Sequence, residues 1–161
     1  MAGVAHADAE LFRGAKYALI GESAEGSTSD GRAAGFVALL ESLGAQPVWL
    51  DAETHDRAVA VVSHLPQMLA VALAEVVQRE TDPTGLPMAL AGRGLRDALR
   101  LAGSPYPMWR DICLTNCENI ARVLERMAQV LGRLRANLNS PELGDKFAAA
   151  NELYKLLQNL Q

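Results

Sequence analysis

"QPVWLDAETHDRAVAVVSHLPQMLAVALAEVVQRE", residues 46–80, contains the point at which the pattern of this chain changes. Its first five residues have the composition of a strand, and Asp51 or Thr54 can then cap a helix that continues to the end of the stretch. After that cap the whole chain has helical spacing, whereas before it strands and a helix alternate. The sequence therefore predicts two parts, residues 1–52 and residues 53–161.

The first part contains two short apolar segments on either side of an amphipathic one. "KYALI" (16–20) and "QPVWL" (46–50) are typical of strands, and "DGRAAGFVALLESLGA" (30–45) has a helical stripe that Gly44 closes. This order, with short connections, predicts a parallel βαβ unit, with a polar glycine-containing loop at 21–31. One such unit cannot cover both faces of its sheet, so we expect it to be the edge of something larger.

The second part predicts four helices. After the first, a helix is expected over 88–103, and a third begins with Pro107 in its first turn. The third carries the longest apolar stripe: Ile112, Asn116, Ile120, Val123, Met127, Val130, Leu134 and Leu138. Such a length favours pairing with another long helix, from a second subunit. The last helix starts at Ser140 and has side chains spaced for burial: Leu143, Phe147, Leu153, Leu157 and Leu160.

Composition narrows the class of protein. The chain has 161 residues, half of them hydrophobic, and a net charge of −4 without a dense basic tract, so we expect one core and no nucleic-acid partner. Cys113 and Cys117 are too few for a disulfide framework and are expected to be reduced. No run of 18 apolar residues and no signal peptide is found, so we expect a cytoplasmic protein without a membrane span.

The first predicted helix carries an unusual amount of polar material. His55 and His64 lie nine residues apart and point in opposite directions on a straight helix, which excludes a two-histidine metal face. His64 and Gln67 share one face, and Pro66 between them frees the carbonyl of Val62 and should kink the helix. Two interpretations remain open: a buried, hydrogen-bonded core histidine, or a helix that lines a site.

A second polar group lies in "GRGLRDALR", residues 92–100. Arg93, Arg96 and Arg100 follow helical spacing, so one face presents three guanidinium groups with Asp97 beside them. Such a cluster suits a small anionic ligand, and the alternative is an exposed, salt-bridged face. The stretch is not a dinucleotide fingerprint, because the third glycine is missing and no strand precedes it.

Together these motifs resemble a known family. "HDRAVAVVSHLPQMLA" followed by "GRGLRDALRLAGSPYPMWRDICLTNCENI" is similar to the prephenate and arogenate dehydrogenases of tyrosine biosynthesis. The shared elements, in order, are His-Asp, Ser-His-Leu-Pro, Gly-x-x-Asp-x-x-Arg and Pro-x-Trp-Arg-Asp-Ile, with Asn-x-x-Asn shortly after. "DAELFRGAKYALI" also resembles the family's Leu-Phe-x-Gly segment, so the likeness extends to about residue 135.

The resemblance implies a fold and a site. Family members are oxidoreductases with a nucleotide-binding domain and a helical domain that forms the homodimer, and they transfer a hydride from prephenate or arogenate to NAD or NADP. The implied fold is mostly α, a helical dimerisation domain preceded by a short βαβ remnant of a Rossmann-type domain. Arg100 would hold a substrate carboxylate. The implied pocket residues are His55, His64, Gln67, Gly94, Arg96, Asp97 and Trp109. In the family the position of Gln67 is often occupied by a histidine. The resemblance therefore leaves open whether the substrate is prephenate or arogenate.

The chain also departs from the family. It contains no G-x-G-x-x-G, and the family's catalytic histidine lies in a His-Pro-Met-Ala-Gly motif, whereas this chain begins Met1-Ala2-Gly3. We therefore expect no catalytic residue, cofactor site or metal site in this chain. The predicted function is the C-terminal substrate-binding and dimerisation part of a prephenate dehydrogenase, inactive alone. The alternative is a stand-alone helical module that binds a small aromatic acid or only itself. A chorismate-mutase-like enzyme would explain neither the βαβ unit nor the Ser-His-Leu-Pro spacing.

Overall fold

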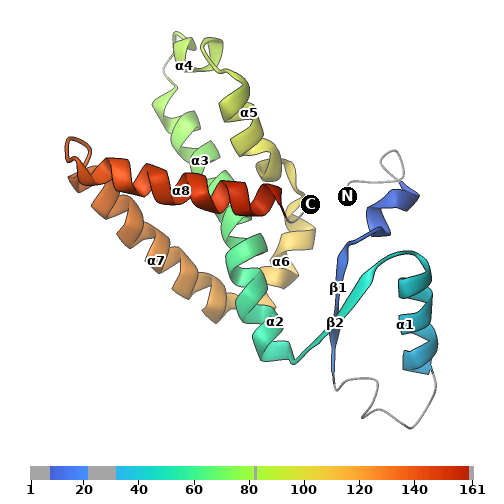
Figure 1. Ribbon diagram of the computed structural model, residues 1–161. Helices are drawn as coiled ribbons and strands as arrows, with labels where there is room; N and C mark the ends of the chain where they lie inside the picture. Colours follow the sequence, from blue (N-terminus) through green and yellow to red (C-terminus); the bar gives the residue numbers. More distant parts are fainter. Residues whose placement is uncertain (1–7, 22–31, 82, 160–161) are drawn as a thin grey trace. The chain divides into compact units, whose positions relative to one another are not determined.

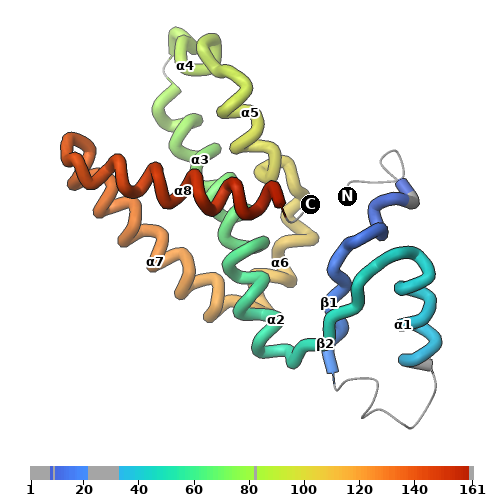
Figure 2. Tube along the Cα trace, in the orientation of Figure 1, coloured from blue at the N-terminus to red at the C-terminus, as the bar shows by residue number. Residues whose placement is uncertain are grey.

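The computed structural model describes residues 8–21, 32–81 and 83–159 (Figures 1 and 2). It is mostly helical, with one small parallel sheet near the start, as the sequence predicts. Chain contacts divide it into two compact units, Met1–Gln67 and Met68–Gln161, and each is described by itself. The polar loop predicted at 21–31 lies, apart from Gly21, outside the described residues.

The first unit begins with the predicted βαβ arrangement. Strand β1 (Lys16–Ile20) is followed by α1 (Arg32–Ser42) and by β2 (Gln46–Leu50). The two strands are parallel, with Lys16 opposite Gln46 and Ile20 opposite Leu50. The strand bounds and the parallel pairing are confirmed.

Gly44 ends α1 and turns the chain into β2. Its φ of 83° lies in the left-handed region, which glycine adopts without a steric penalty. Its carbonyl accepts the N–H of Gly14 at 2.7 Å, and a Cβ here would lie 3.3 Å from the Cα of Arg13. On either side of this turn, Leu40 and Ala45 are buried.

One uninterrupted helical run follows. It consists of α2 (Ala52–Val59), a π-helical turn (Ala60–His64) and α3 (Leu65–Glu80). The predicted start and end are confirmed, because Asp51 accepts the N–H of Thr54 at 2.8 Å and the helix stops at Glu80. Where the sequence predicts a kink at Pro66, the structure places the π turn just before it.

By length and composition, this run is the one helix among the described residues that could cross a membrane. Ala52–Glu80 reaches a mean hydropathy of 1.6 in an 18-residue window. Core helices of globular proteins have the same properties, so the finding is weak evidence for a span.

The second unit is entirely helical where it is described. Beyond α3 it contains α4 (Leu86–Ala89), α5 (Arg93–Leu99) with a 3-10 turn (Arg100–Gly103), α6 (Tyr106–Thr115), α7 (Cys117–Ala136) and α8 (Glu142–Gln158). The prediction of a single helix over 88–103 is wrong. The backbone of Gly92 is extended, which ends the first helical piece, and a 3-10 turn follows α5.

The predicted third helix is broken as well. Asn116, with φ −118° and ψ 28°, separates α6 from α7. Just before it, the hydroxyl of Thr115 donates to the carbonyl of Asp111 at 2.9 Å, and the side chain of Asn116 accepts from Asn119 at 2.7 Å. A threonine hydroxyl that bonds a backbone carbonyl one turn back can bend a helix, and the apolar stripe does not reveal it.

Burial along the long helices is confined to one end. Ile120 and Val123 of α7 are buried, whereas Val130 is exposed. The predicted burial of the α8 stripe is wrong, since Phe147 is 65% exposed and Leu153 and Leu157 are more than half exposed. Leu143 is half-buried, and Leu160 lies outside the described residues. An apolar stripe thus predicts that one face of a helix is apolar, but it does not predict which element or molecule covers that face.

The cap at Asp51 can be tested by substitution. Its side chain satisfies an otherwise unpaired N–H at the start of α2, and hydrogen bonds from Thr54 lower the pKa of the carboxyl. We expect Asp51→Ala to lower the urea midpoint measured by far-UV circular dichroism, and Asp51→Asn to keep most of the stability because its amide oxygen can still accept. Equal losses in both variants would contradict a hydrogen-bonding role for this cap.

Candidate functional site

The π turn shapes the part of the helix that carries the histidines. At its end the N–H of Leu65 bonds the carbonyl of Ala60, five residues back, instead of the usual four. Pro66 follows directly and has no N–H to offer, and in a regular α-helix its ring would meet the carbonyl of Val62. The wider turn relieves that clash, and π turns of this kind often lie at functional sites.

The π turn also changes the direction in which His64 points. A π turn rotates less per residue than an α-helix, so His64 is turned back from the side opposite His55, where a straight helix would place it. The charges of Asp56 and His55 both act on the pKa of His64. Asp56 Oδ1 in turn lies 2.9 Å from His55 Nδ1. The expected opposite orientation of the two histidines assumes a straight helix, whereas a π turn lies between them.

His64 and Gln67 are the buried polar side chains of this helix, 8% and 3% exposed. Burial lowers the pKa of His64 below its ordinary value of 6.5; the charge of Asp56 raises it, and His55 lowers it further. Its imidazole is therefore neutral at physiological pH, with one nitrogen that donates and one that accepts. The helix offers hydrogen-bonding groups there without adding charge.

The second unit carries the predicted arginines on α5. Arg96 and Asp97 lie in the helix, Gly94 is in its first turn, and Arg100 starts the 3-10 turn. All four are exposed, and Trp109 on α6 is half-buried. In the described part of the chain no ion pair joins these arginines to an acid, so the salt-bridged alternative is not observed there.

The structure thus places the predicted residues in two groups. His55, His64 and Gln67 belong to the first unit. The other group, in the second unit, comprises Gly94, Arg96, Asp97, Arg100 and Trp109. The first group lies on one helical run, as the spacing predicted, whereas in the second group Trp109 lies on α6, apart from the residues of α5 and its 3-10 turn.

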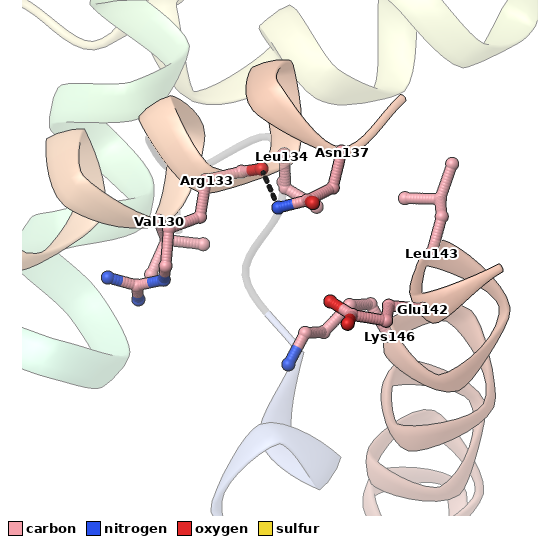
Figure 3. Close-up of a pocket in the computed structure, with 7 residues that line it drawn as sticks. All are labelled: Val130, Arg133, Leu134, Asn137, Glu142, Leu143 and Lys146. Carbon is pink, nitrogen blue, oxygen red and sulfur yellow. Dashed lines mark hydrogen bonds between the residues drawn. The ribbon is translucent and has the colours of Figure 1, made fainter. Parts of the chain in front are cut away.

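A cavity that the sequence did not indicate lies where α7 and α8 diverge (Figure 3). It has a volume of about 320 Å³, and Asn137 at its closed end donates to the carbonyl of Arg133 at 2.9 Å. Its walls are Val130, Arg133, Leu134, Asn137, Glu142, Leu143 and Lys146. None of the predicted site residues lines it. In the sequence only the turn before α8 could have indicated this cavity, because the depth of the cavity depends on the angle between α7 and α8.

Metal and disulfide chemistry find no support in the part of the chain that is described. No group of three histidine, cysteine or acidic side chains is placed there to hold a metal ion. Cys113 and Cys117 are both free, the first half-buried and the second exposed.

Comparison with known proteins identifies the family. Residues 51–158 match the family model described as prephenate dehydrogenase, dimerization domain. The match covers more than half of the chain, so the chain belongs to the prephenate dehydrogenase family.

Individual relatives agree and show the extent of the likeness. A prephenate dehydrogenase of Lactococcus lactis is 30% identical over 95% of this chain and 43% of its own length. The crystal structure of Synechocystis arogenate dehydrogenase has a TM-score of 0.76 at 28% identity, over 92% of this chain and 54% of that one. Prephenate dehydrogenase from Aquifex aeolicus, in complex with hydroxyphenyl propionate and NAD⁺, has a TM-score of 0.77 at 26% identity. The match covers 99% of this chain and 55% of that one. The chain spans about half the length of these relatives.

The neutral state of His64 makes the free energy of unfolding depend on pH. Because the pKa is lower in the folded chain than in the unfolded one, the unfolded state binds more protons as the pH falls below 6.5. The contribution of neutral His64 to the free energy of unfolding is therefore complete above pH 6.5, and it is lost as the pH falls toward the pKa of the folded chain. We expect His64→Gln to flatten this slope between about pH 7 and 5, measured by urea unfolding. Asp56→Asn should steepen it, because the charge that raises the pKa is removed; an unchanged slope in both variants would contradict the assignment.

Proposed function

We propose that this chain is the substrate-binding and dimerisation part of a prephenate dehydrogenase, without dehydrogenase activity of its own. The single observation that carries the proposal is the family match over 51–158. The start of that match supports a functional boundary near residue 52, with a helical domain over 53–161. A location in the cytoplasm agrees with a biosynthetic enzyme of small polar acids.

The arginines of α5 supply the chemistry for holding the substrate. Planar guanidinium groups bind carboxylates through two parallel hydrogen bonds, and prephenate carries two carboxylates. Arg100 is the anchor, Arg96 lies one turn before it, and neither has an acid partner among the described residues to displace. Asp97, Gly94 and Trp109 shape the neighbouring surface.

The helix with the π turn supplies neutral hydrogen-bonding groups. His64 and Gln67 can each donate and accept, so they suit the hydroxyl and carbonyl groups of the same substrate class. His55, held by Asp56, belongs to this region as well. Because Gln67 cannot be protonated, its contribution does not change with pH, and the choice between prephenate and arogenate depends on the other groups.

The residues of this chain do not fit a dinucleotide. The A. aeolicus relative binds NAD⁺, but G-x-G-x-x-G occurs nowhere in this sequence. That fingerprint brings the backbone close to the pyrophosphate at a helix N-terminus. In this proposal NAD or NADP belongs to the complete enzyme, and the residues of this chain act on the substrate alone.

The exposed apolar side chains of α8 favour a second copy of this chain as a partner. Phe147, Leu153 and Leu157 are each more than half exposed on a helix whose described residues are almost all open to solvent. Large apolar side chains exposed on one helix favour an interaction site. The family model that covers α7 and α8 describes a dimerization domain, which supports a homodimer through these long helices.

Substrate binding is tested by calorimetric titration of prephenate into the intact chain and into Arg100→Ala. We expect saturable binding that weakens by about 1–3 kcal/mol in the variant, the range for a hydrogen bond to a charged group. Arg79→Ala is the matched control, since Arg79 pairs with Glu75 on α3 and should leave the affinity unchanged. Absence of binding in every protein would favour the alternative, a dimerisation module without a ligand.

Dimerisation is tested by sedimentation equilibrium of the Phe147→Glu variant. A charge placed in an apolar interface should raise the dissociation constant of the dimer by at least about tenfold. Ala148→Glu, at an exposed residue on the side of the helix away from this stripe, is the control for added charge alone. A dimer of unchanged strength in Phe147→Glu would exclude this face of α8 from the interface.

A further inference from the structure

The cavity between α7 and α8 has no role in the proposed function. Its apolar wall is formed by Val130 and Leu134 of α7 and by Leu143 of α8. Both leucines are half-buried, so the inner part of the cavity is shielded from water. The volume of about 320 Å³ lies at the lower end of the range for small-molecule pockets, which is about 300–1,000 Å³. The cavity can therefore admit a small organic molecule and offers it an apolar surface.

Two cationic side chains border this cavity, one from each helix. Arg133 lies one turn before Asn137 on α7, and Lys146 lies one turn after Glu142 on α8. Both cations are exposed, and in Figure 3 the guanidinium and the amine extend to the side away from Asn137. Their methylene stems can thus extend the apolar wall while the charged ends stay at the mouth of the cavity.

The two cations at the mouth are available to a ligand. Neither Arg133 nor Lys146 forms an ion pair with a described residue. Glu142 is the acid among the residues that line the cavity, and it pairs with neither of them. Two cations and one carboxylate leave the mouth with an unbalanced positive charge. That charge favours an anionic group on the ligand.

The closed end of the cavity has the opposite character. The side-chain nitrogen of Asn137 already donates to the carbonyl of Arg133 at 2.9 Å. The last carbonyls of α7 lie at this end and form the negative end of the helix dipole. An anionic group is therefore disfavoured at the closed end and favoured at the mouth, so a ligand should enter with its apolar part first.

We propose that this cavity binds a small amphipathic carboxylic acid, with its tail against the apolar wall and its carboxylate between Arg133 and Lys146. A guanidinium holds a carboxylate through two parallel hydrogen bonds, and an ammonium group adds a point charge. The unbalanced charge matches a monoanion, whereas a phosphate would bring nearly two negative charges close to Glu142. At roughly 30 Å³ for each water-sized group, the cavity has room for about ten non-hydrogen atoms.

The test titrates octanoate, an acid of about this size, into the intact chain by calorimetry at pH 7. We expect saturable binding of one octanoate per chain. Octanol, which has the same tail without the charge, should bind at least about tenfold more weakly because it lacks the charged hydrogen bonds.

Charge variants locate the bound acid. Arg133→Met and Lys146→Met keep most of each stem and remove the charge, so each should weaken octanoate binding at least about tenfold. Glu142→Gln should strengthen the binding, because a repelling carboxylate is removed. Arg135→Met, at an exposed arginine of α7 that does not line the cavity, is the matched control and should bind as the intact chain does. The substituted side chains are exposed, so the variants should fold, which circular dichroism checks.

Four results would overturn the proposal. The first is no saturable binding, which includes the case in which a second copy of this chain fills the cavity. The second is equal weakening in Arg135→Met and Lys146→Met. The third is unchanged binding in both cavity variants, which would place octanoate on exposed apolar surface. The fourth is binding lost in Arg100→Ala, which would place it on the arginines near α5.

The same variants separate this proposal from the proposed function. Arg100→Ala should lose affinity for prephenate and keep its affinity for octanoate. Lys146→Met should do the reverse, because Lys146 lines the cavity and is not one of the proposed substrate residues. Failure of prephenate binding alone thus leaves the cavity site standing, and failure of octanoate binding alone leaves the substrate site standing.

Discussion

The missing amide hydrogen of Pro66 is the constraint on which the histidine-bearing helix depends. A regular α-helix would bring its ring against a carbonyl, and the chain avoids this with a π turn in which Leu65 bonds Ala60. The extra residue in the turn rotates His64 away from the position that a straight helix would give it. Burial then keeps its imidazole neutral next to Gln67. The backbone irregularity at the π turn thus places His64 in a position where burial lowers its pKa.

The described core is small for a chain of this length. Its buried apolar residues are Leu40, Ala45, Ala60, Ala70, Ile120 and Val123, and half of these are alanines. Large apolar side chains are exposed instead, among them Phe147, Leu153 and Leu157 of α8. Burial of apolar surface is the main favourable term in folding, so a partner that covers these side chains would stabilise the chain.

Sequence patterns predicted correctly those elements that depend on interactions between residues close together in the chain. The strands, the cap at Asp51, the turn at Gly44 and the start of α8 were all predicted, because each depends on residues within a few positions. The break at Asn116 was missed because the apolar stripe continues past it, whereas the hydrogen bond from the Thr115 hydroxyl to the carbonyl of Asp111 is not visible in a hydrophobic pattern. The predicted burial of the α8 side chains was wrong, because hydrophobic periodicity predicts an apolar face but not the molecule that covers it.

The sequence by itself determined the family, the order of the elements and the residue types of the candidate site. Motif spacing and hydrophobic period are properties of the chain alone, so Arg100, His64 and Gln67 could be named without coordinates. Only the tertiary structure decided that a π turn precedes Pro66, that Arg100 lies exposed, and that a cavity lies between α7 and α8. These features depend on helix rotation, burial and hydrogen-bond direction, which arise when segments pack and are not encoded in the spacing of residues.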